Sequence, residues 1–132
     1  MIVDVHTHLW DEPEQMGRGT AERLAGIGDA PPQRLDTSPE AYDEAMAPIT
    51  HSLILGFRSL YLNATIPHEQ VARCVARDPA KYLGFAGIDP MDEDLVGSLD
   101  QAQDLGLVGV LISPAAQAYH PTHTRALRLY EQ

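Results

Sequence analysis

Residues 52–57 read Ser-Leu-Ile-Leu-Gly-Phe, a short and nearly continuous apolar run. A strand that faces water on one side alternates apolar and polar residues, whereas a strand covered on both faces is apolar throughout. The run therefore predicts a buried strand of a parallel sheet. Proteins with such sheets are built from strands and helices that alternate along the chain.

Similar runs recur at residues 82–88 and 107–112, and helical patterns fill the intervals. Pro67 opens a helix that reaches residue 77, and Gly106 ends a helix that begins near residue 92. Two further helices are predicted, at residues 39–47 behind the capping Ser38 and at residues 124–130. The strand starts lie roughly 25 to 30 residues apart, the length of one strand–helix unit.

With a first strand at residues 2–9, these elements predict an α/β fold with four parallel strands in one domain, residues 1–132. A closed eight-stranded barrel does not fit, because that fold takes about 250 residues. Residues 10–37 are rich in Gly, Pro and charge and predict a loop of more than 20 residues, a length typical of functional lids or disordered segments.

The composition, 44% hydrophobic and 21% charged, is that of a globular protein. The net charge is −10 and no cluster of Lys or Arg appears, so we expect neither a nucleic acid nor a membrane as partner. No signal peptide and no long apolar run is evident, which makes a cytoplasmic location the default expectation. The single cysteine, Cys74, is interpreted as a small buried side chain on a helix.

Two histidines stand two residues apart on the first strand. Alternation predicts that His6 and His8 share a face with Asp4, opposite an apolar face made of Val3, Val5 and Leu9. Two imidazoles at this spacing can reach one metal ion, and imidazole suits zinc first, then iron, nickel or manganese. The pattern alone is weak, but the pair stands just before the longest loop, where parallel α/β folds hold their active sites.

Asp4 has two possible roles. It can accept a hydrogen bond from an imidazole N–H and so orient a metal ligand, or it can be a carboxylate that pairs with a neighbouring strand. The sequence leaves both open.

The stretch Ile2-Val3-Asp4-Val5-His6-Thr7-His8 resembles the opening strand of the amidohydrolase superfamily, specifically of its amidohydrolase-related branch. Residues 55–59, 84–90 and 106–114 are similar to the second, third and fourth strands of that branch and their exits. Residues 120–131 are similar to the stretch that leads into its fifth strand. The resemblance thus covers nearly the whole chain and is weakest over residues 11–31.

The resemblance implies the N-terminal half of a (β/α)8 TIM barrel with a divalent metal ion, zinc by preference, held by His6 and His8. In the family a histidine from the fifth strand and an aspartate from the eighth complete the site, and this sequence contains neither strand. Many relatives carry a lysine where this chain has Leu111. A lysine that bridges two metal ions is therefore not expected, and a mononuclear site is.

Arg58, at the exit of the second strand, is predicted either to bind a substrate carboxylate or to form a surface ion pair. His51 and His68 are interpreted as solvated or capping residues. His120 and His123 follow the fourth strand, on the side of the sheet where they could approach a metal ion or a substrate.

These features predict a metal-dependent hydrolase in which activated water attacks the carbonyl carbon of a small-molecule amide, ester or lactone. Two alternatives remain: a metal-dependent decarboxylase of the same superfamily, and an inert, truncated half barrel. No catalytic base is assigned, because such a group would come from strands beyond these four. A half barrel also leaves two open strand edges, which predicts an open sheet or a homo-oligomer.

Overall fold

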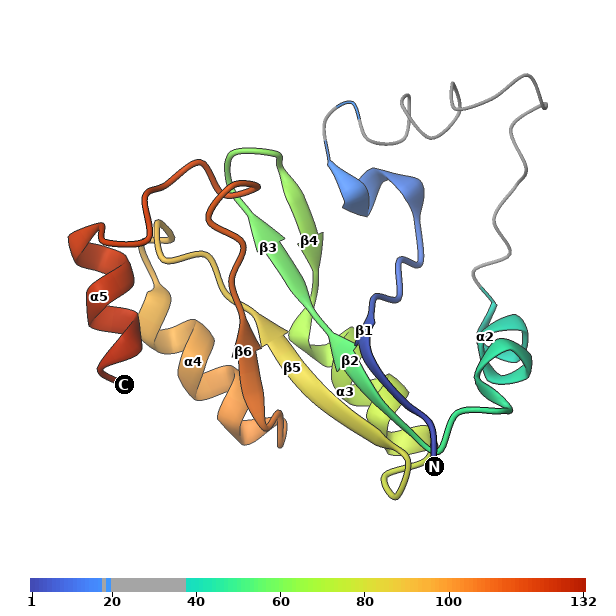
Figure 1. Ribbon diagram of the computed structural model, residues 1–132. Coiled ribbons are helices and arrows are strands. Elements are labelled where there is room, and N and C mark those ends of the chain that lie inside the picture. The colour runs from blue at the N-terminus through green and yellow to red at the C-terminus, as the bar shows by residue number, and fades with distance from the viewer. Residues whose placement is uncertain (18, 20–37) are drawn as a thin grey trace.

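The computed structural model describes residues 1–17, 19 and 38–132 (Figure 1). Residues 18 and 20–37 of the predicted loop lie outside this range. The beginning of that loop contains a short 3-10 helix, η1 (Pro13–Met16).

Four strands form one parallel sheet: β1 (Val3–Thr7), β2 (His51–Leu55), β5 (Tyr82–Gly87) and β6 (Gly109–Leu111). Their order in the sheet is β1-β2-β5-β6, and each strand lies parallel to its neighbours. The order of the four strands in the sheet is therefore their order in the sequence. The predicted α/β fold with four parallel strands is confirmed.

The predicted helices are also present, as α2 (Pro39–Met46), α3 (His68–Arg77), α4 (Leu95–Asp104) and α5 (Thr124–Tyr130). Side chains cap α2 and α4: Ser38 Oγ, as the sequence indicates, accepts from Ala41 N at 3.2 Å, and Asp94 Oδ1 accepts from Gly97 N at 3.2 Å. None of the helices in the described part of the chain is long and apolar enough to cross a membrane.

The end of the predicted strand 52–57 differs from the expectation. β2 stops at Leu55, and after Gly56 the chain forms an antiparallel hairpin of β3 (Phe57–Ser59) and β4 (Ala64–Ile66). Gly56 N donates to Phe85 O at 2.7 Å, and a Cβ on Gly56 would lie 2.6 Å from the backbone nitrogen of Gly87. The backbones therefore approach closely at the point where β2 ends and the hairpin begins.

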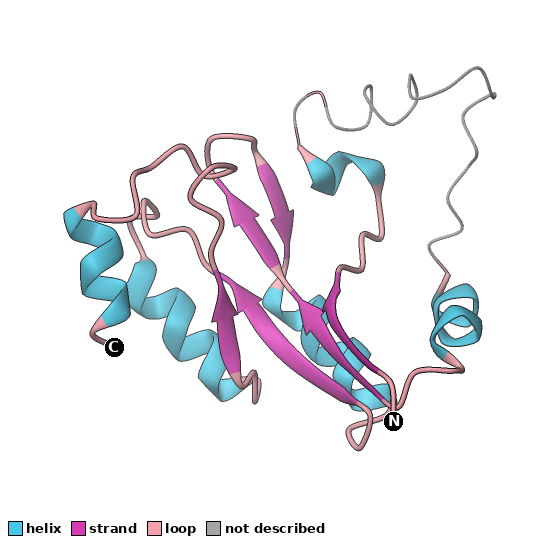
Figure 2. Cartoon of the chain, viewed as in Figure 1, coloured by secondary structure: helices cyan, strands magenta, loops and turns pink. Residues whose placement is uncertain are grey.

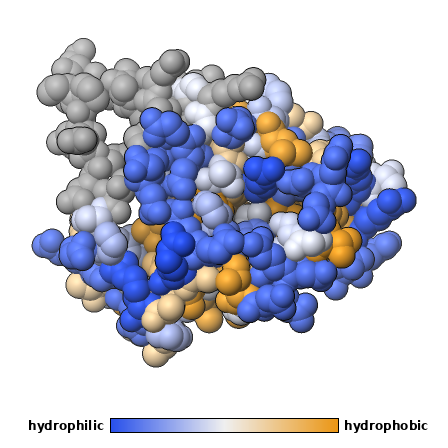
Figure 3. Space-filling view, turned by 180° about the vertical axis from the view of Figure 1, so that it is seen from behind, coloured by the Kyte–Doolittle hydropathy of each residue, from blue (hydrophilic) through white to orange (hydrophobic). Residues whose placement is uncertain are grey.

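The helices cover one face of the sheet. Ile54 and Tyr82 from the strands pack there with Val71 and Cys74 of α3, all at most 5% exposed. α3 lies behind the strands in Figure 2, and the molecule seen from behind is largely hydrophilic over its outer surface (Figure 3). This face therefore has an apolar core under a water-facing helical layer.

The opposite face of the sheet is open. A Cβ on Gly84 would meet side chains of α3, so its neighbour on β5, Leu83, points to the other side, where it is 44% exposed. Val5 of β1 is 64% exposed. A sheet with helices on one face and partly uncovered apolar side chains on the other has the form of a barrel wall that is not closed.

Cys74 occupies the predicted position, 5% exposed on α3. Burial raises the pKa of its thiol to about 11, well above the ordinary value of a cysteine. Because the thiolate is the reactive form, we expect Cys74 of the folded chain to react with a disulfide reagent at pH 8 about 100-fold more slowly than an exposed thiol. The same assay in denaturant is the control, and it should show the ordinary rate. Equal rates in the two conditions would contradict the burial of Cys74.

Candidate functional site

His6 and His8 lie at the carboxyl end of β1. His6 is the next-to-last residue of the strand, and His8 is the first residue beyond it. Their ring centroids are 5.1 Å apart, with the ring planes at 77°. His6 is exposed and His8 is partly buried. The structure thus brings the two predicted metal ligands together, at the edge of the sheet where parallel α/β proteins bind ligands.

An irregularity in β1 sets which way these side chains point. Asp4 pairs with Ser52 and Thr7 with Ile54, with a register shift between them, so Asp4 and Thr7 both face the helices. The expected alternation, with Asp4 on the face of the two histidines, is therefore wrong. His6 and His8 flank Thr7 along the chain and face the open side of the sheet.

The carboxylate of Asp4 holds this irregular segment together. One oxygen accepts from the backbone N–H of His6 at 3.0 Å, and the other accepts from Thr7 Oγ1 at 3.2 Å. These contacts are local, within β1, and differ from both roles that the sequence left open. A part for Asp4 in holding an imidazole stays a prediction.

His8 is fixed by its neighbour strand. Its Nδ1 lies 2.8 Å from the carbonyl oxygen of Leu55, and because a carbonyl only accepts, Nδ1 is the donor. Burial lowers the pKa of His8, an effect that the Leu55 carbonyl opposes and the nearby His6 assists. A neutral ring that donates through Nδ1 keeps the lone pair on Nε2, which is the form that binds a metal ion.

Two aromatic side chains flank His8. The ring centroids of Trp10 and Phe57 lie 5.7 and 6.1 Å from that of His8, and 5.8 Å from each other. The sequence did not single out either residue. Together they make an apolar wall that limits the positions open to the His8 ring.

The donor set is small. Within residues 1–17, 19 and 38–132, no group of three or more His, Cys, Asp or Glu side chains is placed to hold a metal ion. A catalytic zinc site has three protein ligands as a rule. His6 and His8 therefore fit as part of a metal site and need at least one further ligand.

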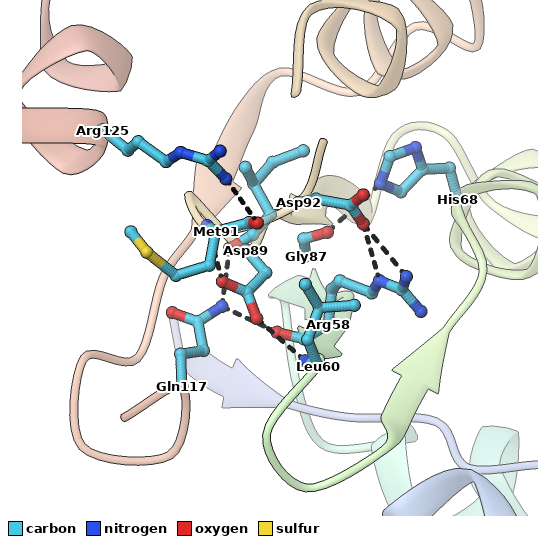
Figure 4. Close-up of polar contacts among 10 residues, drawn as sticks. Arg58, Leu60, His68, Gly87, Asp89, Met91, Asp92, Gln117 and Arg125 are labelled. Atoms are coloured by element: carbon cyan, nitrogen blue, oxygen red, sulfur yellow. Dashed lines mark hydrogen bonds and ion pairs between the residues drawn. The ribbon is translucent and has the colours of Figure 1, made fainter. Parts of the chain in front are cut away.

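Arg58 points away from the histidine pair. Successive residues of a strand face opposite sides, and Phe57, its neighbour on β3, packs against His8. The Nε and Nη2 of Arg58 donate to one oxygen of Asp92, at 3.1 and 3.0 Å (Figure 4). The structure thus shows the ion pair that was one of the two expectations, and a contact with substrate stays a prediction.

A pocket of about 460 Å³ lies beside this ion pair, between the hairpin and the first turns of α3 and α4. Arg58, His68 and Asp92 are among the residues that line it, whereas His6 and His8 are not. The pocket is therefore separate from the candidate metal ligands.

The other histidines have different surroundings. His68 was expected to be solvated or capping, and it is neither: it is 7% exposed, with Nε2 3.3 Å from the carbonyl oxygen of Gly87, because α3 packs its first turn against the end of β5. His51 is exposed at the start of β2, far along the strands from the pair. His120 is exposed, and His123 is exposed and caps α5.

Two buried polar residues that the sequence did not single out join the loops at this edge of the sheet. Asp89, 1% exposed, accepts from the backbone nitrogens of Leu60 and Met91 at 2.8 and 2.9 Å. Gln117 donates to the carbonyl oxygen of Arg58 at 2.7 Å (Figure 4). These hydrogen bonds thus hold the loops after β3, β5 and β6 to one another. The only signal for Asp89 was its place before Pro90 at the end of a strand.

Comparison with solved structures identifies the architecture. The chain superposes on an uncharacterized TIM-barrel protein from Bordetella bronchiseptica with a TM-score of 0.74 at 20% identity, covering 98% of this chain and 50% of that one. The chain has the fold of half a TIM barrel. A probable 2-pyrone-4,6-dicarboxylic acid hydrolase from Acinetobacter baumannii, solved with citric acid bound, gives 0.59 at 13% identity, covering 98% of this chain and 44% of that one.

These likenesses establish the fold of the half barrel, and the chain spans about half the length of the solved structures that it matches. No protein-family model matches the chain. No curated protein matches it in sequence.

Proposed function

We propose that the chain is part of a metal-dependent hydrolase of the amidohydrolase-related kind, with His6 and His8 as two ligands of one divalent metal ion. The observation that carries the proposal is the pair itself: two imidazoles 5.1 Å apart at the carboxyl end of the first strand of a half TIM barrel. The hydrolase among the structural neighbours agrees with it at the level of reaction class.

The hydrogen bond of His8 and the side chains around it support the same proposal. The carbonyl oxygen of Leu55 accepts a hydrogen bond from Nδ1–H, and burial lowers the pKa of His8 and so favours the neutral ring, which can offer the Nε2 lone pair to a metal ion. Trp10 and Phe57 hold the ring and exclude water from one side of it. His6, which is exposed, can turn to complete the pair.

The metal ion, zinc by preference for imidazole ligands, would supply a Lewis acid that polarises a carbonyl group and makes water nucleophilic near neutral pH. The residues of this chain hold that centre, and none of them is assigned as a general base. The substrate class that fits is a small molecule with an ester, lactone or amide bond, and the neighbour described as a 2-pyrone hydrolase favours the lactone.

The test is hydrolysis by the zinc-supplemented chain of a panel of aryl esters and lactones, with the acid product measured. We expect zinc-dependent hydrolysis that the His6→Ala/His8→Ala variant loses and the His51→Ala variant keeps, because His51 is an exposed histidine at the other end of the sheet. Carbon dioxide released from an aromatic carboxylate, with no hydrolysis, would favour the decarboxylase instead. Equal rates in the chain and the double variant would contradict both.

A further inference from the structure

Two hydrogen-bonded glutamines hold the chain just beyond the histidine pair. Gln70, on α3 and 5% exposed, donates from Nε2 to the carbonyl oxygen of Leu9 at 2.8 Å. Its Oε1 accepts from Nε2 of Gln15 at 2.8 Å, and Oε1 of Gln15 accepts from the backbone nitrogen of Asp11 at 2.8 Å. Leu9 and Asp11 are the two neighbours of Trp10, so the glutamines fix the main chain on both sides of this residue.

The amide of Gln70 suits this place because it carries a donor and an acceptor. Its NH2 group binds a carbonyl oxygen, and its oxygen accepts from the second glutamine. An ionised glutamate would offer no donor to Leu9, and a leucine of similar size would offer neither group. Since Gln70 is buried, water cannot readily replace a partner that is lost.

The segment that follows is attached at its other end as well. The short helix η1 contacts β4 of the hairpin (Figure 1). Gly17, at the end of η1, has a φ of +79°, and a Cβ there would overlap the carbonyl oxygen of Leu62 in the hairpin turn. These contacts and the glutamine pair thus hold residues 9–17 against α3 and the hairpin.

Trp10 connects this segment to the candidate metal site. Its ring centroid lies 5.7 Å from that of His8 and 5.8 Å from that of Phe57. The place of the indole depends on the main chain of Leu9 and Asp11, on either side of it. A shift of that main chain would move Trp10 and leave the His8 ring free to turn on that side.

We propose that Gln70 is a positioning residue of the metal site: through Leu9 and Gln15 it holds Trp10 against the His8 ring and so limits the orientations of that ligand before a metal ion binds. The proposal rests on the proposed function for the role of His8. Ordering a ligand in advance reduces the entropy lost on binding, so the effect of Gln70 is expected in the affinity for zinc.

The experiment compares Gln70→Leu with Gln101→Leu in the whole chain. Gln101 is exposed on α4 and donates to Glu69 of α3, so the control also removes a glutamine hydrogen bond to this helix. Trp10 is the only tryptophan in the sequence, so fluorescence reports its surroundings directly. Emission maximum, quenching by acrylamide and zinc affinity are measured for each variant, and urea unfolding shows that each is folded under the conditions used.

We expect Gln70→Leu to shift the emission to longer wavelength, to increase quenching and to weaken zinc binding by about 10-fold, as for groups that orient a metal ligand. Gln101→Leu should match the unchanged chain in all three. If Gln70→Leu does not fold, Gln15→Leu, at a partly exposed position, should show the same changes to a smaller extent.

A double-variant cycle separates positioning from a general structural effect. In a Trp10→Ala background, Gln70→Leu should have little further effect on zinc affinity, because its action passes through Trp10. Fully additive losses would overturn the proposal, as would a zinc affinity that Gln70→Leu leaves unchanged. In both of those cases the proposed function would stand. Absence of zinc binding by the unchanged chain would instead contradict the proposed function, and with it the role of Gln70.

Discussion

Replacing His8 with alanine is expected to weaken zinc binding at neutral pH by on the order of 100-fold or more, because the change removes a prepared ligand from a small donor set. His8 has its Nδ1 held by Leu55 at 2.8 Å and its ring packed between Trp10 and Phe57, so it enters the bound state at little entropic cost. His6, which is exposed, must be ordered on binding, and His6→Ala should cost less.

Competition with a chromophoric zinc chelator measures these affinities. His51→Ala is the matched control, since it removes an exposed imidazole from the same sheet but at the start of β2. It should leave the affinity within about twofold of the unchanged chain, as expected for a residue that does not contact the ion. An equal loss in His51→Ala and His8→Ala would show adventitious binding by surface histidines and would contradict the assignment.

The second large effect concerns Gly87, at the end of β5. A Cβ built on Gly87 would overlap the backbone of Phe57, the first residue of the hairpin. Backbone cannot move aside as a flexible side chain can, so the hairpin must be displaced, and with it the Phe57 ring that flanks His8. We expect Gly87→Ala to lower the free energy of unfolding by about 3 kcal/mol, at the upper end of the range for overpacking.

Gly106→Ala separates this steric effect from a conformational one. Gly106 has a φ of +74° and nothing within 4 Å of an added Cβ, so its substitution costs only the left-handed strain, about 1 kcal/mol. Gly87 is not among the glycines with positive φ. Urea unfolding of the two variants compares the free energies. A loss for Gly87→Ala no larger than that for Gly106→Ala would show that β5 and the hairpin are not in such close contact.

The regular elements were predictable from the sequence because their signals are local. Ser38 followed by Pro39 marks the start of α2, Pro67 precedes the first residue of α3, and the apolar runs near residues 54, 84 and 110 lie in the sheet. The hairpin was missed because Phe57 prolongs the apolar run of β2. At the end of that strand the backbone of Phe57 lies close to Gly87, which is 30 positions further along the chain.

The site was predictable only in part, for the same reason. Spacing on a strand placed His6 and His8 together. The orientation of the His8 ring, however, depends on its hydrogen bond to Leu55, which is distant in sequence. Strict alternation placed Asp4 with the histidines, whereas its hydrogen bonds to His6 N and Thr7 Oγ1 reshape the strand locally. Periodicity along one element does not report such contacts.

The central claim, that His6 and His8 hold a divalent metal ion, is tested most directly by the metal content of the purified chain. Elemental mass spectrometry of the chain, after dialysis against metal-free buffer, would be compared with the His6→Ala/His8→Ala variant prepared in the same way. We expect zinc or another divalent transition metal in the chain and none in the variant. The same metal content in both would contradict the claim, as would a chain that neither retains a metal ion nor takes one up.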